Sequence, residues 1–498
     1  QKISRKPCPF FGKSDSKIAS MQCFFSRYKN KLGYSKVLVE PIKTFIIIKY
    51  LSISMQQSPS KNLKKYLSNS IFFCFATLIS YPAFAYKDTL SQAPYTYENI
   101  DSFKPKCREA LPGQDIRDPE FNQEEALAVW RVSPRLNQNG SIRKDGKIYI
   151  TPIDSETGDL SLISQFEISN ANPVPQKSVI NGPEWANSQR GWEIFYSCYS
   201  LDKKTVRLCK LDRFQNTWRV SALPSSKHKG MRNPSKNALD PVPNLFYQYY
   251  RGKIAKGSSL KKLHFGWRED TENPVDVELS RDIGQGKWMP DGRRIVHTKT
   301  ILSPQDGQTI TQLAIYDRLT NTDDLMFTDG RERHDPFAWY APELNGQLAI
   351  LSIVQNYQTD AWDVEVYRQN EQGEWIIWSL IPPIHQDFRV NYSPEAFVFQ
   401  EKSYISIVSY LGSNLQGWRN QPSIVWIASV DPNLEEAQKV HRIVSQEQDP
   451  SGISHKNDPE SLIIQEGNAA RIYYVDFGVN GEESKLMNCD TGLTLSNR

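Results

Sequence analysis

The sequence predicts an all-β protein, a seven-bladed β-propeller, and a recurring pattern supports this fold class. A proline followed closely by an apolar or aromatic residue occurs seven times between Asp118 and Asp490, each time before strand-like sequence. Successive prolines are 64, 58, 49, 52, 52 and 65 residues apart, close to the roughly 40 to 50 residues of a four-stranded blade once longer loops are added. A ring of six or five blades is the alternative. The seven openings are residues 117–121 (RDPEF), 182–185 (GPEW), 240–243 (DPVP), 288–292 (WMPDG), 341–344 (APEL), 393–396 (SPEA) and 458–461 (DPES).

Each opening is followed by two runs with the composition of β-strands. They are rich in β-branched and aromatic residues, and Asn, Asp and Gly separate them. Helical periodicity is weak, and residues 433–440 form at most a short helical element in a loop. The second strands are expected at residues 126–132, 192–199, 245–250, 294–299, 348–354, 404–410 and 471–476, and the third strands at 147–153, 206–211, 260–267, 311–316, 362–367, 424–430 and 484–488.

Closure of the ring is expected to use the N-terminal part of the domain. The seventh unit reaches its third strand shortly before Arg498, and residues 95–103 (YTYENIDSF) have the composition to supply the missing outer strand. Four cysteines follow residue 85, which allows three pairings or four free thiols. We favour Cys198 with Cys209, in consecutive strands of one repeat, and Cys107 with Cys489, which would hold the two ends of the ring together.

The N-terminal residues predict export. Lys61, Lys64 and Lys65 precede an apolar run at residues 71–79, and Ala83-Phe84-Ala85 follows as a small-residue cleavage site. We therefore expect residues 1–54 to be an upstream extension, 55–85 a signal peptide, and 86–498 a single propeller domain in the periplasm or outside the cell. The apolar run is too short to span a bilayer, and no membrane span is predicted.

Charge argues against nucleic acid as a partner. The whole chain carries a formal charge of +4, but residues 1–85 hold 14 Lys and Arg against two acids. The remaining 413 residues therefore carry about −8, the wrong sign for binding a phosphate backbone. The expected partner is a glycan or a protein or peptide, and the domain is expected to be a monomer.

Acidic residues near the prolines predict a ring of carboxylates at one rim of the central channel. Two carboxyl groups of different proton affinity can hydrolyse a glycosidic bond, one as acid and one as base or nucleophile. The alternative is structural, because a residue repeated in every blade often binds backbone N–H groups of the blade itself. The members of this ring are Asp118, Glu120, Glu184, Asp240, Asp335, Glu343, Glu395, Asp458 and Glu460.

Aromatic residues near the openings are candidates for stacking on sugar rings. Packing between blades is the alternative for each of them, and Trp418, in the polar loop 412–421, is the best candidate for an exposed platform. The candidate binding residues are Trp185, Trp288, Trp339, Glu395, Trp418 and Glu460.

Two family resemblances follow from these openings. Residues 182–185 (GPEW) and 288–295 (WMPDGRRI) resemble the Pro-x-Trp-Ser-Pro-Asp-Gly repeats of TolB-type propellers, a class of non-enzymatic binding platforms. Residues 182–185 and 339–344 (WYAPEL) are similar to arabinanase-type glycoside hydrolases, family 43 and its relatives, which are five-bladed. The second resemblance implies the following catalytic set: Asp118 as base, Glu343 or Glu184 as acid, and Asp240 as a modulator.

No cofactor is predicted. The seven histidines show no pair at metal-ligand spacing, although the acidic turns at residues 154–159 and 321–324 are compatible with calcium. The sequence therefore favours an exported propeller that binds, and could hydrolyse, a glycan at the channel mouth, and it leaves a TolB-like protein-binding platform as the alternative.

Overall fold

The computed structural model describes fifteen segments of the chain. Every described residue belongs to the unit Gln92–Arg498, the second of the two into which the chain divides. The predicted extension and signal peptide thus lie outside the described residues. The described segments are residues 103–111, 116–132, 147–168, 181–188, 191–199, 206–214, 217–222, 232–236, 245–251, 260–267, 275–277, 286–412, 421–445, 454–478 and 484–495.

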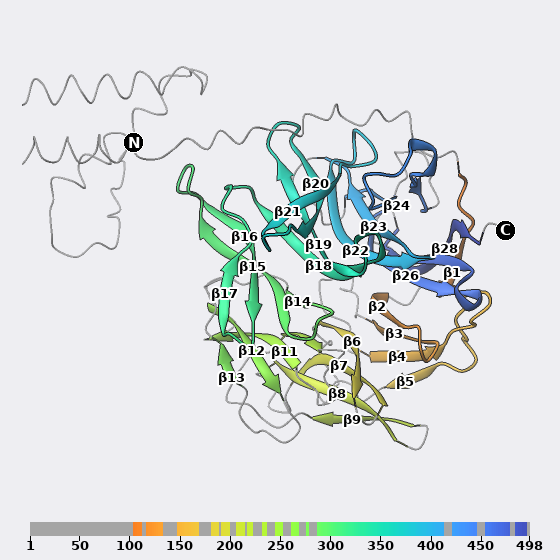
Figure 1. The fold of residues 1–498 in the computed structure, drawn as a ribbon. Coiled ribbons are helices and arrows are strands. Elements are labelled where there is room, and N and C mark those ends of the chain that lie inside the picture. Colours follow the sequence, from red (N-terminus) through yellow and green to blue (C-terminus); the bar gives the residue numbers. More distant parts are fainter. Residues whose placement is uncertain are drawn as a thin grey trace, which may run out of the picture. The chain divides into compact units, whose positions relative to one another are not determined.

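The described residues form an all-β fold of five four-stranded sheets and one eight-stranded sheet (Figure 1). Consecutive strands pair antiparallel. The first three sheets are β2 (Ile116–Asn122), β3 (Leu127–Val132), β4 (Lys147–Pro152) and β5 (Phe166–Ile168); β6 (Asn181–Ser188), β7 (Gly191–Tyr199), β8 (Val206–Phe214) and β9 (Thr217–Ala222); and β10 (Arg232–Lys236), β11 (Leu245–Arg251), β12 (Leu260–Trp267) and β13 (Val275–Val277).

The eight-stranded sheet consists of two antiparallel groups, β18–β21 and β22–β25, joined by one parallel pair, Trp362 with Val390. The remaining strands are β14 (Gly286–Trp288), β15 (Arg294–Leu302), β16 (Thr309–Asp317) and β17 (Thr322–Leu325); β18 (Arg333–Ala341), β19 (Gln347–Asn356), β20 (Ala361–Gln369) and β21 (Trp375–Ile381); β22 (Val390–Phe399), β23 (Lys402–Tyr410), β24 (Ser423–Ser429) and β25 (His441–Ile443); and β26 (Lys456–Ile464), β27 (Ala469–Asp476), β28 (Lys485–Thr494) and β1 (Cys107–Leu111).

The predicted second and third strands all match strands of the structure to within a few residues. The expected helical element at residues 433–440 is a single turn of 3-10 helix, Glu436–Gln438. The first strands of neighbouring groups contact one another in chain order: β2 with β6, β6 with β10, β10 with β14, β14 with β18, β18 with β22, β22 with β26, and β26 again with β2.

A β-bulge at an X-Pro pair recurs in these first strands. The ladder shifts register between Asn457 and Glu460 of β26, for example, and Asp458 lies there with φ 51°. A bulge leaves residues outside the ladder, and proline, which has no N–H to donate, is suited to that position. The same shift occurs at Asp118-Pro119, Gly182-Pro183, Asn233-Pro234, Asp335-Pro336 and Ser393-Pro394.

Two predicted openings lie elsewhere in their repeats. Pro342 belongs to the 3-10 turn Pro342–Leu344, after β18, whereas the bulge of β18 lies at Pro336. Pro290 follows β14 and begins its turn. Proline is favourable both in a bulge and in a turn, so its spacing alone does not distinguish the start of a strand from its end. The third predicted opening, residues 240–243, lies outside the described residues.

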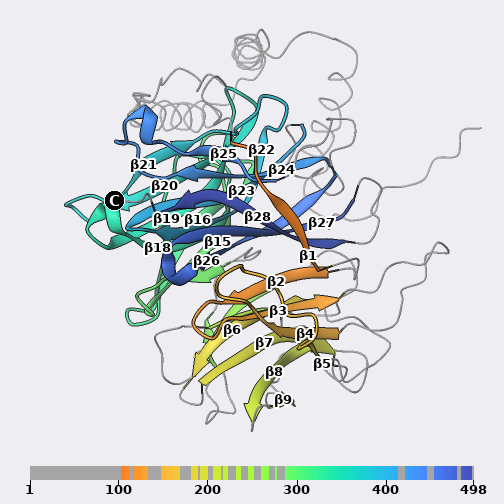
Figure 2. The same ribbon diagram turned by 90° about the vertical axis from the view of Figure 1, so that its right-hand side faces the viewer.

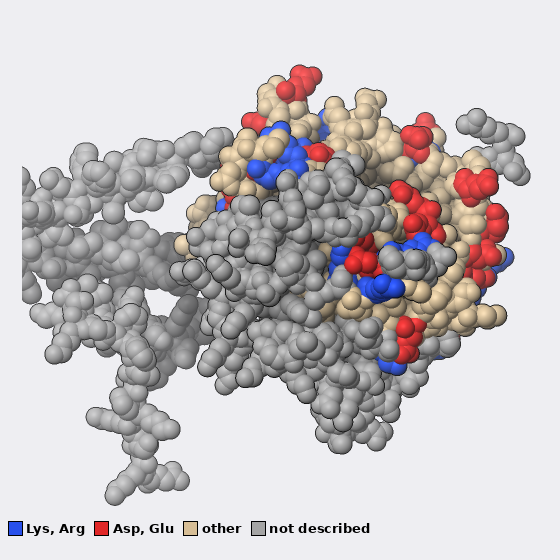
Figure 3. Space-filling model, turned by 90° about the horizontal axis from the view of Figure 1, so that it is seen from below, with Lys and Arg blue, Asp and Glu red and all other residues tan. Residues whose placement is uncertain are grey.

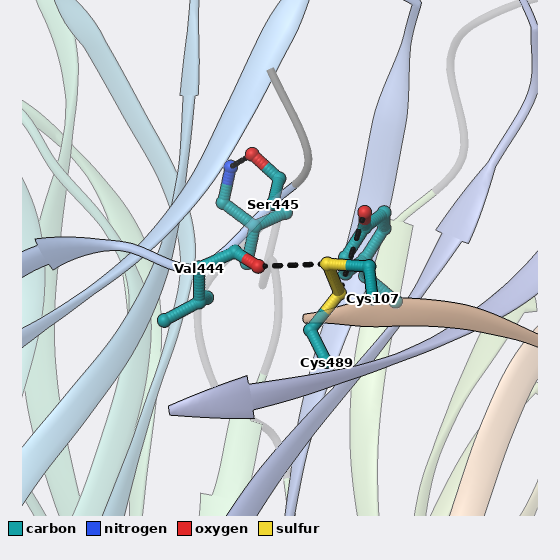
Figure 4. The surroundings of a disulfide bond; sticks show 6 residues. Cys107, Val444, Ser445 and Cys489 are labelled. Atoms are coloured by element: carbon teal, nitrogen blue, oxygen red, sulfur yellow. Dashed lines mark hydrogen bonds between the residues drawn. A yellow bond between two sulfur atoms is a disulfide. The ribbon is translucent and has the colours of Figure 1, made fainter. Parts of the chain in front are cut away.

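The strand β1 joins the two ends of the described region. It pairs antiparallel with β28 (Figure 2). Cys107 lies opposite Cys489, to which it is disulfide-bonded across 382 residues of sequence. The Sγ atom of Cys107 also lies 3.2 Å from the carbonyl oxygen of Val444, which brings this bond against the neighbouring group of strands (Figure 4). Of the segment 95–103, expected to supply the outer strand, only Phe103 is described, and the strand that pairs begins later.

Cys198 of β7 and Cys209 of β8 form the second disulfide bond. These two bonds are the pairs that the sequence favours. Disulfide bonds persist in oxidising compartments, so their presence is consistent with an extracytoplasmic protein.

We predict that the Cys107–Cys489 bond contributes more stability than the Cys198–Cys209 bond. A cross-link restricts the unfolded chain more when it closes a longer loop, and the sequence separations are 382 and 11 residues. The double variant Cys107→Ser/Cys489→Ser should lose about 3–5 kcal/mol of unfolding free energy in urea, and Cys198→Ser/Cys209→Ser should lose less. Equal losses would show that loop closure at β1 does not set the difference.

Candidate functional site

Five first strands bring charged side chains together. Glu120 of β2, Glu184 of β6, Glu395 of β22 and Glu460 of β26 all interact electrostatically with Lys287 of β14. We call these five residues the glutamate cluster. Each glutamate is the first ladder residue after the bulge of its strand, so the repeated bulge gives all four the same placement. Each member of the cluster keeps an intermediate solvent exposure although protein surrounds it closely.

Crowding of like charges shifts the proton affinities of this cluster. Burial, followed by the charge of Glu184, raises the pKa of Glu120 well above its usual range. Burial also raises the pKa of Glu184, and Lys287 opposes that shift. The negative charges act on Lys287 in return, Glu184 most strongly, and raise the pKa of its ammonium group. Lys287 therefore remains protonated near neutral pH.

Glu395 and Glu460 form a hydrogen-bonded pair of carboxyl groups. Burial raises the pKa of both, and the charges of Glu395 and Glu120 raise that of Glu460 further. The bond between them lowers the pKa of Glu395 and raises that of Glu460. Two neighbouring carboxyls do not ionise together, so Glu395 and Glu460 share one proton between them.

Three bulge residues, Asp118, Asp335 and Asp458, carry further carboxyl groups, and we call them the aspartate set. Asp335 accepts a hydrogen bond from the backbone N–H of Ser393, the bulge residue of the next strand group. Asp458 accepts one from the backbone N–H of Asp118, which joins the last sheet to the first. These contacts match the structural alternative, in which repeated acids bind backbone N–H groups.

The aspartate set also contains a pair with different environments. Burial, and then the charge of Asp118, raises the pKa of Asp458 to about 7. Asp118 forms an ion pair with Arg131, whose Nε lies 2.6 Å from Oδ2 of the aspartate. One carboxyl of the pair thus holds its proton near neutral pH, and the other faces a guanidinium group. Such a division is what general acid and base groups require.

Aromatic side chains lie beside the aspartate set. The rings of Tyr392 and Tyr410 are 5.8 Å apart, and His455 stacks on Tyr410 at 5.4 Å. Burial is the main cause that raises the pKa of Tyr410 well above its usual range. The neighbouring Tyr392, Asp458 and Asp335 raise it further. Its hydroxyl donates to the backbone carbonyl of Lys456 at 3.1 Å. Tyr410 is fully buried, whereas Tyr392 and His455 retain partial exposure.

Glu343, predicted as a catalytic acid, lies apart from both groups. Its carboxylate accepts hydrogen bonds from the backbone N–H and the hydroxyl of Ser403, the latter at 2.7 Å. The bulge of β18 is separated from Glu343 by the rest of that strand, roughly 20 Å at about 3.3 Å per residue. The structure therefore gathers Asp118, Glu184, Glu395 and Glu460, but not Glu343.

The predicted tryptophans lie mostly in packing positions. Trp339 is 6% exposed in the core, and its indole N–H donates to Ser403. Trp185 packs edge-on against Trp192 and Trp218, and its N–H donates to the backbone carbonyl of Glu120. Trp288 is half-buried, with the guanidinium of Arg318 5.8 Å from its ring. Trp418 and Asp240 lie outside the described residues.

The sequence reasoning missed Lys287. It lies in Gly286–Trp288, a short first strand that pairs with β15 without a shift of register. The fourth repeat has no X-Pro-Glu opening, but neither does the third, so this absence did not single out Lys287. On the molecular surface, acidic groups are spread over the face seen in Figure 3, and basic groups lie beside some of them.

Among the described residues, no group of three or more His, Cys, Asp or Glu side chains is arranged to hold a metal ion. Within the same part of the chain, no helix is long and apolar enough to cross a membrane.

Comparison with known proteins identifies structural neighbours. No protein-family model and no curated protein matches the chain. The structural neighbours are β-propellers. The propeller domain of the trilobed protease from Pyrococcus furiosus matches with a TM-score of 0.44 and 12% identity, over 78% of this chain and 99% of that one. TolB from Acinetobacter baumannii matches with a TM-score of 0.35 and 11% identity, over 71% and 78%.

A sialidase from Trypanosoma rangeli, solved with sialic acid, matches with a TM-score of 0.36 and 14% identity, over 78% of this chain and 59% of that one. The chain spans 53% of the length of a similar prolyl endopeptidase. At these low identities and TM-scores, the neighbours assign no activity to the chain.

We predict that replacing Asp335 by Asn stabilises the protein at high pH. Burial raises the pKa of Asp335 to about 6, from an ordinary value of 3.8. The folded state thus holds this proton more tightly, so the carboxyl's favourable contribution is full below pH 3.8 and is lost as pH rises through about 6. The variant should gain about 1–3 kcal/mol in unfolding free energy at pH 8 and nothing near pH 4.

Asp154→Asn is the matched control for this experiment. Asp154 is exposed and accepts backbone N–H groups from Thr157 and Glu156, which lower its pKa. The sign is therefore reversed, and this variant should lose stability at pH 8. A gain by Asp335→Asn that is equal at pH 4 and pH 8 would show that ionisation is not its cause.

Proposed function

We propose that residues 86–498 form an exported, seven-bladed β-propeller that is closed by β1. In this proposal the propeller binds a glycan at the rim of its central channel where the aspartate set lies. The closed order of contacts between first strands, with β26 returning to β2, supports the blade count. Pairing of β1 with β28, together with the Cys107–Cys489 bond, supports the closure.

The observation that carries the glycan proposal is the pair formed by Asp118 and Asp458. Carboxylates accept hydrogen bonds from sugar hydroxyls, and the partly exposed Tyr392 beside them offers an apolar ring face. Asp458, with a pKa of about 7, is suited to protonate a glycosidic oxygen. Asp118, held by Arg131, is suited to act as base toward the water that attacks the sugar.

In this scheme the proton passes from Asp458 to the leaving oxygen as the glycosidic bond breaks. Asp118 accepts a proton from the attacking water as the new C–O bond forms. Glu184, whose charge interacts with that of Asp118, is the alternative candidate for the acid. Neither step requires a cofactor. The predicted acid Glu343 has no part in it, since both its carboxylate oxygens bind Ser403.

A non-enzymatic binding platform is the second candidate. It is favoured by the backbone bonds that Asp335 and Asp458 accept from the next repeat. If the role of these carboxyl groups is to make these structural hydrogen bonds, the rim would bind a protein or peptide without catalysing a reaction. In both candidates the ligand meets the same rim, and the domain acts as a monomer.

We predict that Asp458→Asn abolishes polysaccharide hydrolysis, because Asn keeps the backbone acceptor but has no proton to give. The rate of reducing-end release from a polysaccharide panel should fall by about 10²-fold or more, and so should that of Asp118→Asn. Activity of the unaltered protein, assayed from Tyr86 onward, should decline above about pH 7 as Asp458 loses its proton.

Glu371→Gln, in an exposed turn, is the control and should retain full activity. Glycan-array binding by Asp458→Asn, with hydrolysis lost, would support recognition and catalysis together. Glycan binding by the unaltered protein without any hydrolysis would leave a lectin-like role. Neither binding nor hydrolysis, with retained capture of a peptide ligand, would favour the platform and exclude the glycan proposal.

A further inference from the structure

We propose that Asn457 is a positioning residue for Asp458, and that Tyr410 holds its amide in the orientation that binds the aspartate's carboxyl group. The three side chains form a chain of hydrogen bonds that leads from a buried strand to the aspartate set. The catalytic consequence rests on the function proposed above, in which Asp458 is the acid. The hydrogen bonds themselves do not depend on that function.

The contact between Asn457 and Asp458 is the first argument. Nδ2 of Asn457 donates to Oδ1 of Asp458 over 2.8 Å. The same carboxyl group accepts a hydrogen bond from the backbone N–H of Asp118, in the first sheet. Donors on two strands, β26 and β2, therefore hold one carboxyl group, and hydrogen bonds of this kind favour its ionised form.

The orientation of the Asn457 amide is the second argument. The hydroxyl of Tyr410 lies 3.0 Å from Oδ1 of Asn457 and 3.1 Å from the backbone carbonyl oxygen of Lys456. Both partners are acceptors, and burial raises the pKa of Tyr410 well above its usual range, so the hydroxyl keeps its proton and donates it. Because the amide oxygen of Asn457 faces Tyr410, the NH₂ group faces Asp458.

Packing fixes Tyr410 in turn. Its side chain is fully buried, and its ring stacks on that of His455 with the centroids 5.4 Å apart. Tyr410 belongs to β23, which is paired on one side with β22 and on the other with β24. The side chain therefore has little freedom to move, and the carboxyl of Asp458 is oriented before any ligand binds.

The charged groups around Asp458 stay the same when Asn457 is replaced. After burial, the charge of Asp118 raises the pKa of Asp458, whereas Arg131 and Arg117 lower it. The strand β24 carries no charged residue. The other strands packed against β26 contribute Tyr392 and Glu395 of β22, Tyr410 of β23 and, opposite Lys456, Asp476 of β27. A changed titration of Asp458 in an Asn457 variant therefore reports the loss of the amide bond.

A titration that requires no substrate tests this role. Because the pKa of Asp458 is about 7 rather than its ordinary 3.8, its stabilising contribution is full below pH 3.8 and is lost as pH rises through about 7. Unfolding free energy in urea, measured on the full chain from pH 4 to pH 10 with and without Asp458→Asn, locates the pH at which this loss levels off. Asn457→Ala should raise that pH by about 1 unit, because it removes a donor to the ionised carboxyl.

Tyr410→Phe should shift the titration in the same direction by a smaller amount. The amide of Asn457 is still present in this variant, but it is free to rotate. The backbone carbonyl of Lys456 keeps the hydroxyl of Ser423 as a donor at 3.1 Å, so Asn457 is the group that loses its partner.

Asn356→Ala is the matched control. Nδ2 of Asn356 donates to Oδ2 of Asp363 over 2.8 Å, the same kind of bond in another part of the fold. Its removal should leave the titration of Asp458 unchanged.

Hydrolysis by the unaltered protein provides a second readout. In Asn457→Ala the decline of kcat at high pH should begin about 1 pH unit later, since Asp458 keeps its proton longer. The maximal kcat should fall about 10-fold with little change in KM, because the carboxyl is less well oriented.

A shift in Asn457→Ala that is absent from Asn356→Ala would support the proposal. An unchanged titration in Asn457→Ala, even with a lower Tm, would show that Asn457 contributes only to packing and would overturn it. If Asn457→Ala does not fold, Tyr410→Phe decides in the same way. Failure of the unaltered protein to cleave any glycan would refute the proposed reaction, while the titration would still decide the role of Asn457.

Discussion

The fold depends on contact between its last sheet and its first. Each group of strands buries apolar side chains against its neighbours, so a terminal group without a partner would expose a hydrophobic face. The junction is filled by one hydrophobic cluster that includes Trp130, Ile116 and Leu111 from the start of the described region and Tyr473, Val475 and Leu486 from its end. The β1–β28 pairing and the hydrogen bond from Asp118 to Asp458 lie at this same junction. Apolar burial and a carboxylate thus act across one boundary, and the β1–β28 pairing and the Cys107–Cys489 bond hold the N-terminal strand in the last sheet.

The sequence predicted the strands well and the function of the prolines only in part. Alternation and β-branched composition located the second and third strands because both of these strands are long and half-buried. Six of the seven first strands are interrupted by a bulge, which breaks the alternation at the point where the candidate site residues lie. Proline marks that bulge at Pro119 and Pro459 but marks a turn at Pro290 and Pro342. No local property of the sequence separates these cases, since both positions lack a ladder partner for the N–H group.

The sequence predicted which kind of residue forms the candidate site and in which repeats those residues lie. It did not predict which of these side chains interact with one another. Glu120, Glu184, Glu395 and Glu460 share an X-Pro-Glu context, which was sufficient to place them at equivalent positions. Glu343 shares the Pro-Glu letters but follows its strand, and its bonds to Ser403 join one strand group to the next. Lys287 could not be found by similarity, because its short strand, Gly286–Trp288, contains neither a proline nor a glutamate. A cation opposite several carboxylates is recognised only when the separate strands are brought together in space.

The two acidic groups differ in what holds them, and this difference bears on function. In the aspartate set, Asp335 and Asp458 are fixed by backbone N–H groups and Asp118 by Arg131, so the carboxyl positions are set before any ligand arrives. In the glutamate cluster, compensation comes from a single flexible lysine and from a proton shared between Glu395 and Glu460. Fixed groups suit recognition of a defined ligand, because little ordering is required on binding. Charges balanced by a mobile proton respond instead to the pH of the surroundings. The bulges of β2 and β26 therefore each carry two kinds of carboxyl group: an aspartate within the bulge, held by Arg131 or by a backbone N–H, and a glutamate just after it that lies among like charges.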